Sequence, residues 1–132
     1  MKSLLILILI FFSNQSYSGW EKINETNKSI TYYFKKDNYK TFFGNVEVTF
    51  ISNLKYPDTI SSDRRDRDGN YINESYLSIR SSLEYDCKRQ KQRLLNMKYF
   101  SGEMGQGTVV TEVKTKTDWF KLGVNDQSIF CN

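Results

Sequence analysis

The sequence contains no histidine among its 132 residues. Histidine is the commonest general base and the usual partner of a nucleophilic serine or cysteine, so its absence excludes Ser-His and Cys-His catalytic pairs. Two cysteines without histidine also fall short of the ligands that a zinc site needs. We therefore expect a protein that is not an enzyme and uses no metal or other cofactor.

Long apolar runs are scarce as well. The longest, Leu4–Phe12, is far shorter than the roughly 20 residues that a membrane-spanning helix needs. It follows Lys2 and precedes a polar stretch with small residues before Gly19, which is typical of a cleaved secretory signal peptide; an uncleaved anchor is the alternative. We expect residues 1–18 to be the signal peptide and residues 19–132 to be the exported domain, without a transmembrane segment. The domain would act in the periplasm, at the outer surface or outside the cell.

Only two cysteines are present, Cys87 and Cys131. In a small exported domain such a pair most simply forms one disulfide; two free thiols and an intermolecular bridge are the alternatives. The bridge would close a loop of about 45 residues, which the chain-entropy model credits with roughly 4 kcal/mol. It would also fasten the end of the chain, which otherwise tends to fray, to the middle of the fold.

The net charge is modest, at +4. This balance favours anionic partners only weakly and does not indicate nucleic-acid binding. The densest cations follow Cys87 and form the best candidate for a partner-binding patch, which we call the basic segment: Lys88, Arg89, Lys91 and Arg93. Its partner would be an acidic polysaccharide, a phosphate-bearing surface or an acidic protein segment. Pairing of these cations with carboxylates of the same domain is the simpler interpretation.

What the chain has in abundance is alternation of β-branched and aromatic residues with polar ones. The alternating runs cover residues 20–23, 30–34, 46–50, 77–86 and 109–113. A period of two indicates half-buried antiparallel strands. The pattern places Tyr85 inside and Glu84 and Asp86 on a solvated outer face. We predict a mostly β fold: a single antiparallel β-sheet domain, meander or sandwich-like, with a short C-terminal helical turn and one disulfide.

Residues 88–100 allow two interpretations. Their Lys, Arg, Gln and Leu content favours a helix by propensity. The alternation that ends at Cys87 instead favours a strand that returns beside the preceding one. This hairpin would set Glu84 opposite Arg93 and Asp86 opposite Lys91, and such opposite charges stabilise a strand pair. We favour the hairpin, although its turn lacks the usual Asn-Gly chemistry.

Turn-forming residues separate the runs. The single proline, Pro57, opens a polar stretch to about Asn73 that we expect to be a long mobile loop. Its Asp/Arg-rich part, 63–70, resembles a calcium-binding loop in spacing, but Arg64 stands where the first ligand should be. Three glycines, Gly102, Gly105 and Gly107, precede a β-branched run rather than a helix. We therefore expect them to serve a tight turn and not a phosphate site.

Aromatic residues are frequent, and those expected in the core are Tyr32, Phe34, Phe50, Tyr85 and Trp119. The aromatics near the turn before residue 46, namely Tyr39, Phe42 and Phe43, are expected to cover the core or a sheet edge. An exposed apolar contact is the alternative for them. At the C-terminus, Ile129, Phe130 and Cys131 are expected to press toward the core.

Several of these stretches resemble the surface-adhesin protein E family, small exported proteins of Gram-negative bacteria. The resembling residues are Glu84–Cys87, Arg93–Leu95, Tyr99–Val110, Asp118–Trp119 and Cys131. The resemblance implies an antiparallel β domain with a disulfide at the positions of Cys87 and Cys131. For the founding adhesin it also implies binding of host matrix and plasma proteins such as vitronectin and laminin. The matching residues are of a framework type, so no ligand-contacting residue is carried over.

This chain departs from the family pattern in three respects. It has no lipid-anchor cysteine after its apolar run, its segment after Trp119 is short, and it carries the Asp/Arg-rich residues 63–68. We predict an exported, non-enzymatic, adhesin-like binding domain with a protein or acidic surface as partner, host extracellular-matrix proteins among them. The alternative is a periplasmic structural or envelope-assembly protein that binds bacterial components. A homodimer is compatible with either function.

Overall fold

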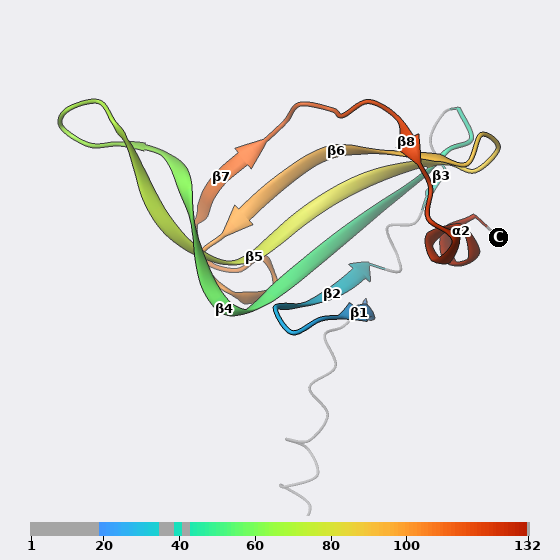
Figure 1. Cartoon of the computed structure of the whole chain (residues 1–132), viewed down its shortest axis with the longest axis horizontal. Coiled ribbons are helices and arrows are strands. Elements are labelled where there is room, and N and C mark those ends of the chain that lie inside the picture. The colour runs from blue at the N-terminus through green and yellow to red at the C-terminus, as the bar shows by residue number, and fades with distance from the viewer. Residues whose placement is uncertain (1–18, 35–38, 41–42, 132) are drawn as a thin grey trace, which may run out of the picture.

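The computed structural model describes residues 19–34, 39–40 and 43–131. Within them one curved antiparallel sheet carries a short helix near its C-terminal end (Figure 1). The strands are β1 (Trp20–Glu25), β2 (Ser29–Phe34), β3 (Tyr39–Lys40), β4 (Val46–Arg65), β5 (Tyr71–Asp86), β6 (Lys91–Phe100), β7 (Val109–Val113) and β8 (Phe120–Lys121). The helices are the 3-10 turn η2 (Glu103–Gly105) and α2 (Val124–Phe130). The predicted fold class is confirmed. The predicted signal peptide lies outside the described residues.

The strands follow one another as a meander. Their order is β1-β2-β4-β5-β6-β7, with β3 added beside β4 and β8 beside β6. Between β5 and β6, Glu84 lies opposite Arg93 and Asp86 opposite Lys91, as the hairpin interpretation required. The helical alternative for residues 88–100 is wrong. In the described part of the chain, no helix combines the length and apolar character needed to cross a bilayer.

The polar stretch from Pro57 to Asn73 is not the long loop that we expected. It forms the outer halves of β4 and β5, which bend away from the body together as an arm (Figure 1). Pro57 falls within the irregularity between Asn53 and Asp58, where the ladder is already interrupted, so its missing N–H breaks no pairing. Only residues 66–70 remain as a turn. There the Asp66 carboxylate accepts the N–H groups of the residues two and four positions later, at 2.9 and 3.0 Å.

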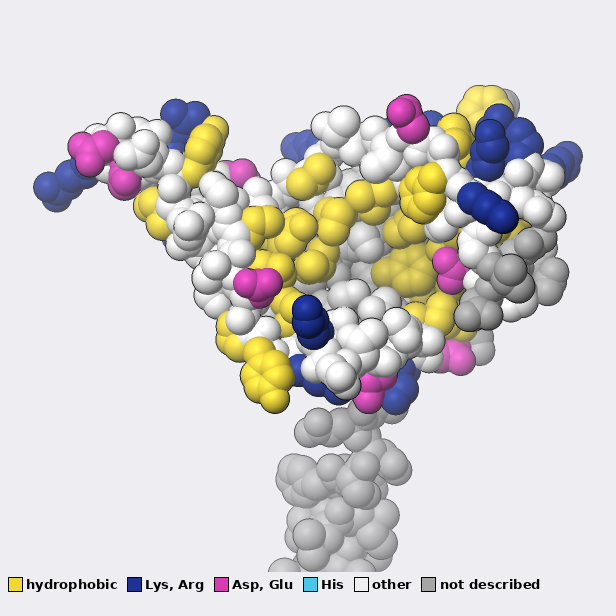
Figure 2. All heavy atoms as spheres, viewed as in Figure 1, with side chains coloured by type: hydrophobic (Ala, Val, Ile, Leu, Met, Phe, Trp, Pro, Cys, Tyr) yellow, Lys and Arg dark blue, Asp and Glu magenta, His cyan; other side chains and the backbone are white. Residues whose placement is uncertain are grey.

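The curvature of the sheet leaves a hollow between this arm and the helix end of the molecule. Apolar side chains gather along the floor of the hollow (Figure 2). The arm also contacts β7, where the Thr111 hydroxyl donates to Asp63 Oδ1 at 2.9 Å. A polar sequence therefore forms ordered strands, since backbone pairing and a few specific hydrogen bonds replace an apolar core there.

One face of the sheet, the helix face, carries the main core. Its buried members are Tyr33, Val48, Phe50, Tyr85, Leu122 and Phe130. In β2 the buried residue is therefore Tyr33, and not Tyr32 or Phe34 as expected. The ring centroid of Phe130 in α2 lies 5.2 Å from that of Tyr33, 5.6 Å from that of Phe50 and 5.2 Å from that of Tyr85. Aromatic pairs at such distances add stability beyond their buried area. The predicted disulfide between Cys87 and Cys131 forms next to this cluster. Ile129, expected to be core, is instead 43% exposed.

The opposite face is covered in part by the segment around η2. Ser78 in β5, which the alternation placed outside, is fully buried there. Its hydroxyl donates to the Gly102 carbonyl at 2.6 Å and accepts the Gly105 N–H at 2.9 Å. Gly105 has a φ of 70°, a left-handed conformation that favours glycine, and it packs over Ile51. The glycines therefore serve a turn, as predicted.

Candidate functional site

The basic segment lies at the β5–β6 turn and the start of β6. Three of its members, Lys88, Arg89 and Arg93, line a hollow of about 420 Å³, which we call the Trp119 pocket. Its other lining residues are Phe43, Asn45, Glu84, Asp86 and Trp119. The fourth predicted residue, Lys91, is exposed and does not line it. Sequence neighbours and a distant tryptophan thus meet on the face of the sheet opposite the helix face.

Arg93 is held by two different interactions. Its guanidinium donates from Nε and Nη2 to Glu84 Oε1 at 2.7 and 2.6 Å. The same guanidinium lies over the Trp119 ring, 4.4 Å from its centroid, in cation–π geometry. The side-chain N–H of Asn45 donates to the other oxygen of Glu84, Oε2, at 3.1 Å. Both carboxylate oxygens of Glu84, a residue that is only 5% exposed, therefore accept a hydrogen bond.

Asp86 is satisfied within the turn itself. It accepts the Nε of Arg89 at 2.6 Å and the backbone N–H of the same residue at 3.1 Å. The hydrogen bond from the Arg89 side chain, reinforced by that backbone N–H, lowers the pKa of Asp86. Arg89 in turn lies 5.5 Å from the Trp119 centroid. The strand register sets Lys91 opposite Asp86, but the ion pair of Asp86 is formed by Arg89 from the turn.

Two expectations are corrected here. Glu84 and Asp86 are buried, not solvated, because the arginines and Trp119 cover this face. Trp119, expected in the core, is half-buried on the opposite side of the sheet, where it serves as the platform for the arginines. The alternation around residue 85 could not reveal this, since the covering residues come from another part of the chain.

Among the residues that line the Trp119 pocket, Phe43, Lys88 and Arg89 are exposed. Phe43 is 84% exposed, which selects the exposed-contact alternative for this residue. The other two aromatics of that turn lie outside the residues whose side chains are described. Lys88 and Lys91 are exposed and form no ion pair within the described part of the chain. An aromatic before a glycine turn, as in Phe43-Gly44, was the only sequence signal that could have singled out this rim.

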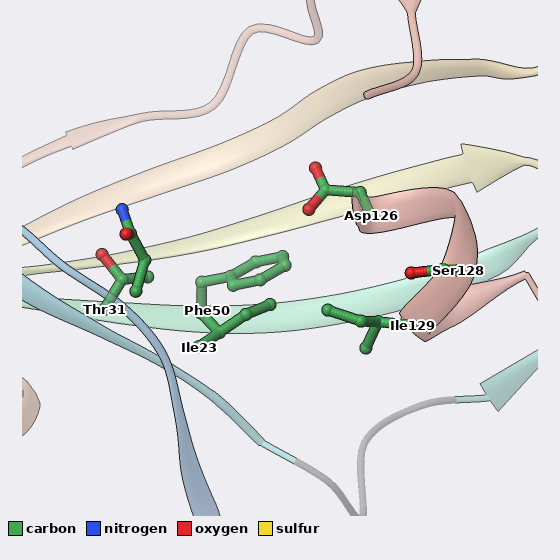
Figure 3. A pocket seen from close by; sticks show the side chains of 7 residues that line it. Ile23, Thr31, Phe50, Asp126, Ser128 and Ile129 are labelled. Carbon is green, nitrogen blue, oxygen red and sulfur yellow. The ribbon is translucent and has the colours of Figure 1, made fainter. Parts of the chain in front are cut away.

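A second hollow of about 600 Å³ lies on the helix face between α2 and the first strands, and we call it the α2 pocket. Its lining residues are Ile23, Asn24, Thr31, Phe50, Asp126, Ser128 and Ile129. Figure 3 shows the Phe50 ring as its floor, with side chains of the strands on one side and those of α2 on the other. Burial raises the pKa of the Asp126 carboxyl. Sequence patterns did not single out this pocket.

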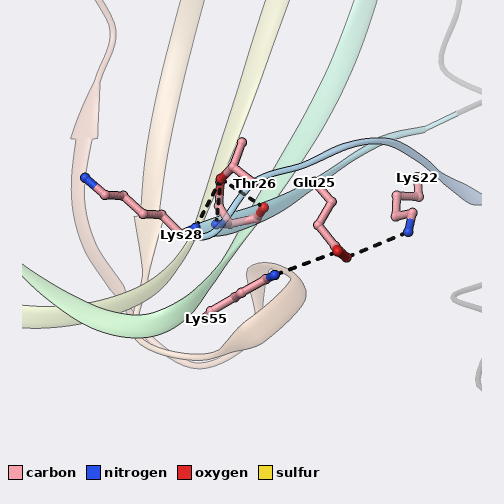
Figure 4. A network of polar contacts seen from close by, with 6 residues as sticks. Lys22, Glu25, Thr26, Lys28 and Lys55 are labelled. Atoms are coloured by element: carbon pink, nitrogen blue, oxygen red, sulfur yellow. Dashed lines mark hydrogen bonds and ion pairs between the residues drawn. The ribbon is translucent and has the colours of Figure 1, made fainter.

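The strand that carries Ile23 is fastened by a surface network (Figure 4). Glu25 lies between Lys22 at 3.8 Å and Lys55 at 3.7 Å, and Thr26 Oγ1 accepts the N–H of Ser29 at 3.1 Å. Exposed ion pairs contribute little stability each, typically below about 1 kcal/mol. The Glu25–Lys55 pair joins the end of β1 to β4, whereas the Lys22 and Thr26 contacts lie within β1 and the β1–β2 turn.

Comparison with known proteins agrees with this architecture. Residues 20–129 match the family described as surface-adhesin protein E. The chain belongs to the surface-adhesin protein E family. None of the curated proteins compared with it matches. Among solved structures, crystal form II of Haemophilus influenzae protein E is similar, with a TM-score of 0.64 and 15% sequence identity over 89% of this chain and 90% of that chain.

Membership of the surface-adhesin protein E family confirms the resemblance found in the sequence. At 15% identity the solved structure shows a shared fold and does not transfer contact residues. The family description fits an adhesin-like protein of the cell exterior. The described residues hold no cluster of three or more Cys, His, Asp or Glu side chains that could bind a metal ion.

Proposed function

We propose that this chain is an exported, non-enzymatic binding domain whose partner is a protein or an acidic surface, with host extracellular-matrix and plasma proteins as the first candidates. Residues 1–18 direct export, and residues 19–132 form the binding domain. Membership of a surface-adhesin family over residues 20–129 supports this function.

We place the contact surface at the rim of the Trp119 pocket. The observation that carries this assignment is Phe43, which is 84% exposed beside a hollow lined by cations. Exposed aromatics and nearby cations are typical anchors of protein interfaces. Within the basic segment the roles divide. Lys88 and Lys91 are free to meet a partner, whereas Arg89 and Arg93 support the rim through their pairing with buried carboxylates.

A localisation experiment tests the biological setting. Protease added to intact cells should degrade an adhesin displayed at the surface, and should leave a periplasmic protein untouched until the outer membrane is permeabilised. Protection on intact cells would overturn the adhesin function and favour the envelope-assembly alternative, in which the partner is a bacterial component.

A binding experiment tests the surface itself. The oxidised protein is applied to immobilised vitronectin and laminin, at low and at high salt. A Phe43→Ala/Lys88→Ala variant should bind about tenfold more weakly, because it removes one aromatic anchor and one cation. The matched control is Tyr56→Ala/Lys28→Ala, which removes an aromatic that is 76% exposed and a lysine from a different hollow. Equal losses in both variants would place the contact elsewhere.

A further inference from the structure

The α2 pocket is built by an irregularity in β1. Consecutive residues of a strand normally face opposite sides of a sheet. Between Lys22 and Asn24 the register with β2 shifts by one residue, and as a result Ile23 and Asn24 both line the same hollow. Bulges of this kind recur beside binding sites, where they redirect a side chain.

Two polar side chains of this pocket have no partner among the described residues. Asp126 and Asn24 make no hydrogen bond or ion pair with any of them, and Asn24 is exposed to water. Asp126 is only half-exposed, and a carboxylate withdrawn from water without a donor is disfavoured. The raised pKa of its carboxyl reflects the same loss of hydration. The pocket therefore presents to a ligand the Asp126 carboxylate, which is partly withdrawn from water and has no hydrogen-bond donor among the described residues.

Between these two groups the pocket is apolar. Phe50 forms the floor and is 9% exposed, while Ile23 and Ile129 form the walls (Figure 3). Ile129 is 43% exposed although it belongs to a helix whose neighbouring Phe130 is buried. An aliphatic chain laid over Phe50 would contact Ile129 and remove it from water.

We propose that the α2 pocket binds a primary ammonium group carried on an alkyl stem, namely a lysine side chain of a partner protein. The ammonium donates to the Asp126 carboxylate, and the stem packs on Phe50. An ammonium has three donors and no acceptor, so the carboxylate oxygens of Asp126 and water can accept all of its hydrogen bonds. A volume of about 600 Å³ also leaves room for the backbone that carries the lysine. The site is separate from the Trp119 pocket, and its occupancy does not depend on the function proposed above.

Other occupants fit the pocket less well. An anion would meet the Asp126 carboxylate in partly desolvated surroundings, where like charges repel strongly. A calcium ion needs six to eight oxygen ligands, more than the carboxylate, amide and hydroxyl groups of this lining supply. An uncharged apolar ligand would leave the Asp126 carboxylate without a donor.

Nuclear magnetic resonance titration of the oxidised, exported protein tests this site with three probes of equal length. Hexylammonium should shift the amide signals of residues 23–24 and 126–129 and bind in the millimolar range. Hexanol should bind about tenfold more weakly, and hexanoate should leave these signals unchanged. Equal binding of hexanoate and hexylammonium would overturn the proposal.

Two variants and a peptide pair sharpen the test. Asp126→Asn preserves shape and should weaken hexylammonium binding about tenfold, whereas Asp118→Asn, which removes an exposed carboxylate elsewhere, should have no effect. The peptide acetyl-Gly-Lys-Gly-amide should bind, and its Nε-acetylated counterpart should not. Unchanged binding in Asp126→Asn would refute the site, and binding of hexylammonium without the lysine peptide would refute a lysine side chain as its occupant.

Discussion

The Trp119 pocket and the α2 pocket treat their carboxylates in opposite ways. Glu84 and Asp86 are almost completely buried, yet each accepts hydrogen bonds from an arginine and from a further N–H group. Asp126 is less buried but has no donor among the described residues. The comparison teaches that burial of a charge does not by itself mark a binding site. What marks one is burial without compensation.

The difference follows from how each pocket is built. In the Trp119 pocket the arginines and carboxylates come from one hairpin. The strand register sets Arg93 opposite Glu84, and the turn brings Arg89 beside Asp86. In the α2 pocket a short helix is placed on the sheet by Phe130 and by the disulfide. The first turn of α2 then faces strand residues that are distant from it in the chain. None of the described residues there donates a hydrogen bond to Asp126.

The largest expected effect comes from removing the disulfide that places α2. The Cys87→Ser/Cys131→Ser variant should lose about 4 kcal/mol of unfolding free energy, because the bond joins residues 44 positions apart. Urea denaturation measures the loss. In the folded variant, hexylammonium binding should disappear while the indole signal of Trp119 keeps its position. A shifted Trp119 signal would show that the two pockets are not independent.

The second prediction breaks the compensation in the Trp119 pocket. Arg93→Met should cost about 2–3 kcal/mol in urea denaturation, since it leaves the buried Glu84 carboxylate without its cation. Glu84→Gln in the same chain should recover part of that loss. Lys91→Ala, which removes an exposed cation from the same strand, should change stability by less than about 0.5 kcal/mol. A double variant as unstable as the sum of the two single variants would show that the pair is not coupled.

The third prediction concerns the pH dependence of Asp86. Because Arg89 lowers its pKa in the folded state, the ionised carboxylate stabilises the fold above its unfolded pKa, and this contribution is lost as the pH falls through the folded pKa. Asp86→Asn should therefore cost about 1 kcal/mol at pH 7. The difference from the parent protein should shrink below about pH 4, near the ordinary pKa of an aspartate. Urea denaturation at pH 7 and at low pH measures both values, and a difference that does not change with pH would argue against the ion pair.

The smallest effect has the opposite sign. Burial raises the pKa of Asp126, so its ionised form destabilises the fold at neutral pH, and the fold gains as the pH falls through the folded pKa. Asp126→Asn should stabilise the protein at pH 7. The gain should stay below about 0.5 kcal/mol, because the carboxylate keeps part of its contact with water. Destabilisation by this variant would mean that Asp126 already has a compensating partner.

Local features of the fold could be predicted from the sequence, and the candidate sites only in part. Alternation and opposite charges predicted the β5–β6 hairpin with its register, and glycine spacing predicted the turn before β7. The arm was missed, because backbone pairing made strands of residues whose polarity indicated a loop. The exposed Phe43 was left open, since an aromatic near a turn can cover an edge or face the solvent.

Residues near one another in the chain decide the strand periodicity, the turns and the pairing of Glu84 with Arg93, and these could be predicted from the sequence. The disulfide joins distant residues, but it could be predicted because the chain has only two cysteines. The tertiary structure alone decided which faces are covered. Trp119 lies over the β5–β6 hairpin, and α2 lies over Phe50, although neither is near these partners in the chain. The period of two tells which residues share a face, but not what packs on that face, because the covering segments arrive through long-range contacts.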